Sequence, residues 1–288
     1  MASVLVLIAA PGSGAITSRI AQTARKMGGT LNWLAEGEAC ELDIFEQVFE
    51  FGEVLRGLPI DVNLVETSKR RKKLLIADMD STMIHQECID ELGVLAGLGD
   101  QIKDITARAM RGELDFERAL KKRVSLLKGL DESVITQLLH ERITFIEGGK
   151  TLLTTMKAHG AYAALVSGGF TAFTSHVATV LGFDENRANT LLIKNGRLTG
   201  EVAMPILGKE AKVESLKRIC AKRGISQEEV IAVGDGANDI PMLLEAGMGV
   251  ALHAKPKVQE AAPICINHGD LTALLYLQGY RKAEFVSE

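Results

Sequence analysis

The stretch "LLIADMDSTMIHQE", residues 74 to 87, decides the fold of this chain. It begins as an apolar run typical of a buried strand and ends in two aspartates, Asp78 and Asp80, separated by one residue. Two neighbouring carboxylates at the end of a buried strand are costly unless a cation or a reaction partner is present. The pair therefore either caps the helix that follows or holds a metal ion and takes part in a reaction.

Short apolar runs alternate with helical segments after this stretch. The runs are "AYAALVS" at 161–167, "VIAVGD" at 230–235, "MGVAL" at 248–252 and "PICI" at 263–266. Near-continuous apolar strands separated by helices predict a parallel sheet covered on both faces. Ligands of such sheets bind beyond the carboxyl ends of the strands. Asp78, Ser167 and Asp235 end three of these strands, so we expect them to converge at one edge.

Two segments interrupt this alternation. The residues between Glu87 and Phe145 have helical periodicity and predict a helical cap inserted after the first strand. In "NTLLIKNGRLTGEVA", residues 189 to 203, the pair Asn195-Gly196 between two β-rich arms predicts a tight hairpin. We expect this hairpin to pack beside the sheet, outside the parallel core.

The N-terminal residues form a separate unit in the sequence pattern. Residues 1–68 carry strands and helices in the order β-α-β-β-α-β, which is a ferredoxin-like pattern. The basic run "KRRKK" at 69–73 follows, and we expect it to be a solvated linker.

The composition excludes several classes of protein. The chain has 288 residues, 47% of them hydrophobic and 24% charged, with a net charge of -4, as in globular proteins that do not use nucleic acid as their main partner. The apolar run "VLVLIAA" at 4–10 is too short for a membrane span. Four cysteines without C-x-x-C spacing suit a reducing compartment, so we expect a cytoplasmic protein.

A second acidic cluster lies in "AVGDGANDIPM", residues 232 to 242, where Asp235 ends a strand and Asp239 follows among glycines. Taken alone, this segment is also consistent with a glycine-rich turn that caps a helix. Two acidic clusters on one sheet favour oxygen ligands for a hard cation such as Mg²⁺.

Four motifs occur in order along the chain: "DMDST", "VSGGF", a lysine in "GKEAK" and "VGDGANDIPM". They are similar to the four motifs of the haloacid dehalogenase superfamily, and the chain from about residue 74 to 277 resembles its phosphoserine phosphatases. The resemblance implies an α/β fold with a doubly wound parallel sheet (69–87 and 146–288) and an inserted helical cap (88–145). Residues 1–68 resemble the small α+β, ACT-like domain that precedes some enzymes of this kind.

The resemblance also implies roles for the acidic residues. Asp78 is expected to be the nucleophile that becomes an aspartyl-phosphate, and also a ligand of Mg²⁺. Asp80 is expected to bind the metal through its carbonyl oxygen, to protonate the leaving group and then to activate water. Asp235 completes the metal ligands, and Asp239 supports the site behind them or through water.

Further residues are expected to bind the substrate. Ser167, the N–H of Gly168 and Lys212 would hold the phosphate. Lys212 is preferred to Lys209 because "AKVE" matches the family's position.

The remaining substrate contacts concern the amino-acid part of the molecule. By resemblance, Glu87 would bind an ammonium group, Arg123 a carboxylate, and Phe116 would close over the substrate from the cap. Asn238 matches a substrate-contacting asparagine.

The activity implied is hydrolysis of O-phospho-L-serine to L-serine and phosphate, the last step of serine biosynthesis. One alternative is a related phosphatase or phosphotransferase acting on phosphothreonine, phosphohomoserine or another small monoester. Another is a non-catalytic amino-acid sensor. The N-terminal unit is expected to join two copies into a homodimer.

Overall fold

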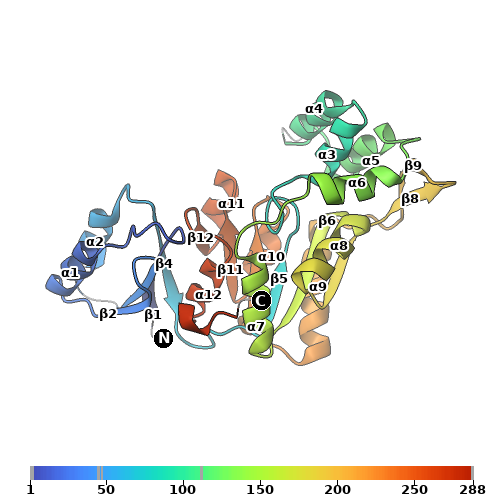
Figure 1. Cartoon of the computed structure of the whole chain (residues 1–288). Helices are drawn as coiled ribbons and strands as arrows, with labels where there is room; N and C mark the ends of the chain where they lie inside the picture. The colour runs from blue at the N-terminus through green and yellow to red at the C-terminus, as the bar shows by residue number, and fades with distance from the viewer. Residues whose placement is uncertain (1–2, 44–45, 47, 111–112, 287–288) are drawn as a thin grey trace.

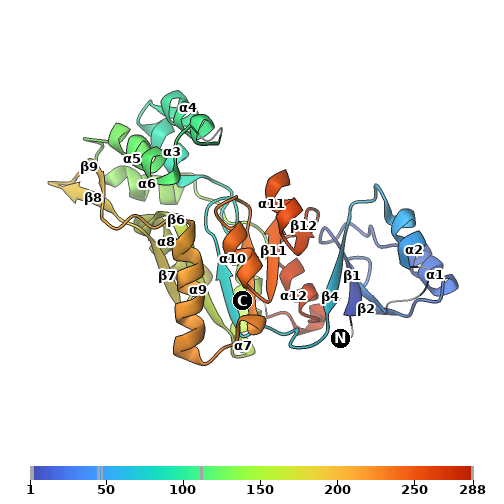
Figure 2. The ribbon, with the colours of Figure 1, turned by 180° about the vertical axis from the view of Figure 1, so that it is seen from behind.

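The computed structural model describes residues 3–43, 46, 48–110 and 113–286. Three parts lie side by side: an N-terminal lobe, a central α/β core and a group of helices above the core (Figure 1). Seen from behind, the core still lies between the other two parts (Figure 2). Nowhere in the described ranges is a helix long and apolar enough to cross a membrane.

The core is built on a six-stranded parallel sheet in the order β12-β11-β10-β5-β6-β7. Its strands are β5 (Leu74–Ala77), β6 (Tyr162–Phe170), β7 (Glu185–Asn189), β10 (Val230–Gly234), β11 (Met248–Leu252) and β12 (Ile264–Ile266). The five apolar runs all form strands, as predicted. The sequence "ENRAN" of β7 was missed because it is polar and lies at the edge of the sheet.

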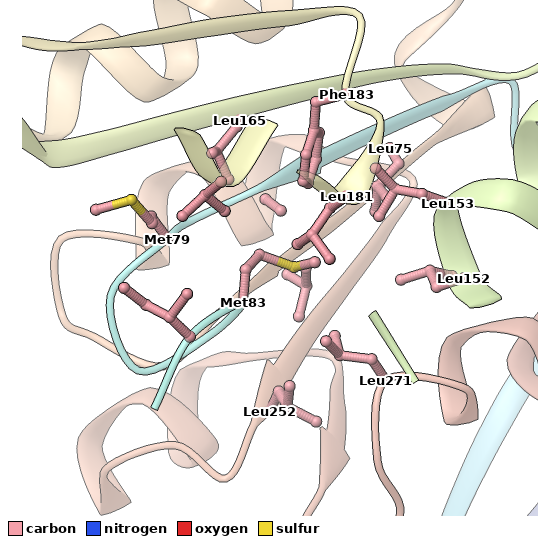
Figure 3. Packing of buried hydrophobic residues seen from close by; sticks show 14 of the residues in the cluster. Leu75, Met79, Met83, Leu152, Leu153, Leu165, Leu181, Phe183, Leu252 and Leu271 are labelled. Atoms are coloured by element: carbon pink, nitrogen blue, oxygen red, sulfur yellow. The ribbon is translucent and has the colours of Figure 1, made fainter. Parts of the chain in front are cut away.

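Helices cover both faces of this sheet. They are α7 (Gly149–Ala158), α8 (Thr171–Leu181), α9 (Lys209–Arg223), α10 (Ile240–Glu245), α11 (Pro256–Ala261) and α12 (Ala273–Leu277). Leu75 belongs to the apolar cluster on one face, whereas Leu74 and Ile76 belong to the cluster on the other. Figure 3 shows Leu75 with Leu165 within the first cluster. Burial on both faces explains why β5 is apolar without alternation.

The cap consists of four helices between β5 and β6. They are α3 (Cys88–Leu95), α4 (Gly99–Met110), α5 (Phe116–Leu126) and α6 (Ser133–Glu141). This arrangement, with the parallel sheet and the separate N-terminal sheet, confirms the predicted fold class.

The predicted hairpin forms, with β8 (Leu191–Lys194) and β9 (Arg197–Val202) joined by Asn195 and Gly196 at φ of 52° and 73°. It lies outside the parallel core, but the expectation that it packs beside the sheet was wrong. The N–H of Leu198 donates to the carbonyl of Leu130 at 2.9 Å, so the hairpin is attached to the segment between α5 and α6 of the cap. Leu198 itself is 2% exposed and is buried against the cap.

The N-terminal lobe has the predicted order of elements. They are β1 (Ser3–Ala9), α1 (Ser18–Lys26), β2 (Leu31–Ala35), β3 (Ala39–Asp43), α2 (Val48–Leu55) and β4 (Ile60–Glu66). The sheet is antiparallel in the order β2-β3-β1-β4, which is the ferredoxin-like arrangement.

The basic run at 69–73 is a solvated linker only in part, because Lys69, Arg71 and Lys73 are exposed but Arg70 and Lys72 are not. Arg70 pairs with Glu41 at 2.5 Å and donates to the carbonyl of Leu277 at 2.6 Å. Lys72 is 7% exposed, and its ammonium donates to the carbonyl of Glu228 at 2.6 Å. Both side chains donate hydrogen bonds to backbone carbonyls. Those at the end of α12 have no N–H donor within the helix, so Arg70 supplies one.

Candidate active site

The carboxyl ends of two neighbouring strands bring three aspartates together. Asp78 follows β5, Asp235 follows β10, and Asp239 lies just before α10. One carboxylate oxygen of each lies within 4.8 Å of the others, and all three side chains are buried. Such a set of oxygen donors suits a hard divalent cation, and the convergence predicted for Asp78 and Asp235 is observed.

Lys212, in the first turn of α9, is the cation of this cluster. Its Nζ lies 2.8 Å from Asp78 Oδ2 and 2.5 Å from Asp239 Oδ1. Burial alone would lower the pKa of Lys212, but the charges of Asp239 and Asp78 outweigh it and raise the pKa, so the ammonium stays charged. Lys209, by contrast, is exposed and lies 4.0 Å from Glu210. The structure thus places Lys212, and not Lys209, at the carboxylates.

Asp239 accepts two hydrogen bonds in this cluster. Besides Lys212, it accepts a hydrogen bond from the N–H of Gly236 at 2.9 Å. Burial, together with the charge of Asp78, raises the pKa of Asp239 to about 7. One of its oxygens lies within 4.8 Å of an oxygen of Asp78 and of one of Asp235. The geometry therefore adds Asp239 to the carboxylates within reach of an ion.

The side chain of Asp80 lies outside that trio of carboxylates and contacts the start of the cap and the end of β6. Its Oδ1 accepts a hydrogen bond from the N–H of Cys88 at 3.1 Å, at the start of the cap. A Cβ at Gly169 would lie 2.8 Å from Asp80 Oδ2, so glycine is what allows this close approach. Burial and the charges of Glu87 and Asp78 raise the pKa of Asp80 to about 8. Its carboxyl group can therefore carry a proton at neutral pH.

The end of β6 is irregular where it lies beside Asp80, because its pairing with β7 is interrupted between Val166 and Phe170. Ser167 is 3% exposed, and its Oγ accepts the N–H of Gly169 at 2.9 Å. Asn189 holds this segment from the neighbouring strand: its amide donates to the carbonyl of Gly168 at 2.9 Å, and its Oδ1 accepts the N–H of Leu207 at 2.8 Å. Sequence analysis missed Asn189, although a polar residue at the carboxyl end of a strand was the available signal.

Thr82 was missed as well. Its side chain is fully buried and its hydroxyl donates to Asp235 Oδ1 at 3.2 Å. The hydroxyl thereby fixes one oxygen of a candidate metal ligand. The signal was its place in "DMDST", two residues after Asp80.

The cap contributes a positively charged side chain, Arg123, to the site whose aspartates come from the core. Arg123, on α5, donates to Thr106 Oγ1 at 3.5 Å and to the carbonyl of Ala119 at 3.4 Å. Burial lowers the pKa of Arg123, and the charges of Asp90 and Glu87 oppose this.

The other residues predicted to bind the substrate lie near the carboxyl ends of β5, β6 and β10. Glu87 accepts a hydrogen bond from Ser81 Oγ at 3.1 Å, and its pKa is raised by burial and by the charges of Asp235 and Asp78. Phe116 is 37% exposed, and its ring extends from the cap to the core. A Cβ on Gly168 would lie 3.1 Å from the Cζ atom of Phe116. Asn238 is half-buried in the loop between Asp235 and Asp239.

Residues 75–244, more than half of the chain, match the family model of the haloacid dehalogenase-like hydrolases. The chain belongs to the haloacid dehalogenase-like hydrolases. The family expected from the four motifs is confirmed, and the matched residues of this hydrolase contain Asp78, Lys212 and Asp235.

Known members of the family extend the comparison. A phosphoserine phosphatase of Streptomyces coelicolor is 43% identical over 228 residues, which are 79% of this hydrolase and 55% of the relative. The chain thus spans about half the length of that relative. A solved structure of a probable phosphoserine phosphatase from Vibrio cholerae matches with a TM-score of 0.82 and 32% identity, over 98% of this chain and 88% of the other. A phospho-aspartyl intermediate analogue of a phosphoserine phosphatase matches with a TM-score of 0.67 and 43% identity, over 72% and 98%.

Proposed function

We propose that this chain is a Mg²⁺-dependent phosphatase that hydrolyses O-phospho-L-serine to L-serine and phosphate. The observation that carries the proposal is the position of Asp78. It lies at the end of the central strand, 2.8 Å from a buried lysine and beside two further buried carboxylates. Relatives named phosphoserine phosphatase, together with Glu87 just before the cap and Arg123 within it, support the choice of substrate.

The buried charges fit a divalent cation. Three buried aspartates, Asp78, Asp235 and Asp239, lie close to one buried lysine, Lys212, and such an excess of negative charge is unfavourable without a further cation. Asp78, Asp235 and the carbonyl of Asp80 would hold Mg²⁺. When bound, the ion supplies positive charge between a carboxylate and a phosphate that would otherwise repel each other.

Asp78 and Asp80 divide the chemistry between them. A carboxylate oxygen of Asp78 attacks phosphorus, the bond from phosphorus to the serine oxygen breaks, and Asp80 gives its proton to that oxygen. A water molecule then gives a proton to Asp80 while its oxygen attacks the phosphorus of the aspartyl-phosphate. Phosphate leaves, and Asp78 returns to a free carboxylate. Lys212, Ser167 and the N–H of Gly168 stabilise the charge on the phosphate oxygens.

Recognition of the serine part uses the cap. Glu87 binds the ammonium group, and Arg123 binds the carboxylate through its planar guanidinium. Phe116 covers the substrate where the cap meets the core, and Asn238 contacts it from the loop after β10. Closure of the cap excludes bulk water from the reaction.

The test is phosphate release from O-phospho-L-serine by the full chain, with and without Mg²⁺, beside phosphothreonine and a sugar phosphate. We expect release that depends on Mg²⁺ and is fastest with phosphoserine. A preference for another ester would favour a related phosphatase. Absence of release from every ester would favour an amino-acid sensor.

We also propose a division of the chain and a role for its first part. Residues 1–68 form an ACT-like unit that joins two copies, residues 69–87 and 146–288 form the catalytic core, and residues 88–145 form the cap. The four cysteines are free thiols, which suits the reducing cytoplasm. Sedimentation of the full chain should give twice the monomer mass, and the monomer mass would contradict the dimer.

A further inference from the structure

A second lysine lies at the acidic edge of the sheet. Lys255 comes between β11 and α11, and its N–H donates to the carbonyl of Asp235 at 3.3 Å. Its Nζ lies 3.8 Å from Asp235 Oδ2. The side chain of Lys255 is 53% exposed, whereas that of Lys212 is 1% exposed. The cluster therefore has one buried lysine, held by two carboxylates, and one lysine whose side chain is half exposed to solvent.

Lys255 lies where carboxylates of the core and of the cap meet. Burial raises the pKa of Asp235 in the core, and the charge of Lys255 opposes this rise. The same opposition is found at Glu87, just before α3, and at Asp90 within α3. Carboxylates of the core and of the cap thus both experience the charge of the Lys255 ammonium group.

An ion pair of 3.8 Å between the half-exposed Lys255 and Asp235 stabilises the protein little by itself. A divalent cation on Asp235 would also repel the ammonium of Lys255, because both are positive. The ammonium of Lys255 then lies without its partner Asp235, beside a site that receives a phosphate. Lysine, a compact charge on a flexible chain, is well suited to meet such a group.

We infer that Lys255 is a mobile phosphate-binding residue of this site. It pairs with Asp235 before Mg²⁺ is bound and turns to a phosphate oxygen once metal and substrate are present. The inference rests on the proposed function and adds to it a contact from outside the four motifs. It gives the phosphate two lysine partners, Lys212 from behind and Lys255 from the entrance.

Calorimetry on the full chain tests this with two probes. The first titration is Mg²⁺ alone, and the second is inorganic phosphate at saturating Mg²⁺. The variants are Lys255→Gln, Lys255→Arg and the control Lys257→Gln, which removes the same charge from an exposed residue of α11. Because Lys255 is exposed, its replacement should leave the fold intact, and Lys255→Met repeats the test should the Gln variant be unstable.

We expect Lys255→Gln to bind Mg²⁺ about two- to fivefold more tightly, since a cation beside Asp235 is gone. Phosphate should bind about tenfold more weakly, since a charge-assisted contact is lost, and the deficit should shrink at high salt. Lys255→Arg should stay near the wild type in both titrations, and Lys257→Gln should equal it.

Any other combination overturns the inference. Weaker binding of both probes would mean that Lys255 only supports the loop of Asp235. Values equal to those of Lys257→Gln would mean that it does nothing in the site. Neither titration uses phosphoserine, so a wild type that fails to hydrolyse phosphoserine would contradict the proposed function and leave this result standing.

Discussion

Asp78 and Asp80 lie two residues apart and have different surroundings. Asp78 accepts the N–H of Met79 at 2.8 Å and faces the ammonium of Lys212. Asp80 faces the cap, and burial with the charges of Glu87 and Asp78 raises its pKa to about 8. Two carboxylates with unlike environments suit a nucleophile and a proton donor, respectively.

Arg123→Ala tests substrate recognition at this scale. Loss of a charge-assisted contact to the carboxylate should raise KM for phosphoserine by about 10- to 100-fold and change kcat little. Steady-state assays should show a much smaller change with phosphoethanolamine, which lacks the carboxylate. Arg118→Ala, an exposed change on the same helix, is the control. Equal losses on both substrates would show that Arg123 does not bind the carboxylate.

Among the elements, those that bury apolar residues were predictable and those held by polar contacts were not. The run from Leu74 revealed β5 because both of its faces are buried. β7, which contains Asn189, is a polar edge strand and gave no such signal. The place of the hairpin depends on hydrogen bonds between Leu198 and the segment between α5 and α6, which are far apart in the chain. Asp78 and Asp235 were found because each follows an apolar run that predicts a strand. Asn189 was not found because the strand that it ends is polar.

Close packing of α10 on the sheet gives a stability prediction. A Cβ on Gly249 in β11 would lie 2.0 Å from the carbonyl oxygen of Leu243. Gly249→Ala should therefore destabilise the protein by about 3 kcal/mol or more, because backbone must move. Gly52→Ala in α2, which meets nothing within 4 Å, should instead stabilise it by about 0.5–1 kcal/mol. Urea unfolding of both variants checks this, and equal effects would contradict it.

The short helix η1 (Gln227–Glu229) gives a pH prediction. Hydrogen bonds from Lys73 and from the N–H of Ser226 lower the pKa of Glu229 from 4.5 to about 2. A carboxylate with a lowered pKa stabilises the fold above its ordinary pKa, and this contribution disappears as the pH falls through the lowered value. The difference in Tm between wild type and Glu229→Gln should thus be full at pH 6 and shrink from pH 4.5 towards pH 2. A difference that is constant over this range would contradict the assignment.

At the scale of the whole molecule, the N-terminal lobe covers the edge of the catalytic sheet. Asn63 on β4 donates to the carbonyl of Cys265 at 2.9 Å and accepts its N–H at 3.1 Å, as a neighbouring strand would. Asp61 accepts the N–H groups of residues 267–269 at 2.7–2.9 Å. An otherwise open strand edge is thereby blocked, and the lobe is joined to the core by buried polar bonds.

Asp61→Ala should weaken the whole chain and not only its first lobe. Loss of three charge-assisted bonds that leave backbone N–H groups unpaired should cost about 2–5 kcal/mol. Calorimetry of the wild type should give one cooperative transition, and that of Asp61→Ala an early transition of the lobe. Glu66→Ala, an exposed change on the same strand, should shift stability by about 0.5 kcal/mol or less. Two separate transitions already in the wild type would contradict this coupling.

The central claim is that Asp78 receives the phosphoryl group. The most direct measurement is rapid acid quenching of the full chain with Mg²⁺ and O-phospho-L-serine labelled at phosphorus, followed by peptide mapping. We predict label on the peptide containing Asp78, and neither label nor turnover above about a thousandth of wild type in Asp78→Asn. Rapid turnover with no label on the protein, or full activity of Asp78→Asn, would contradict it.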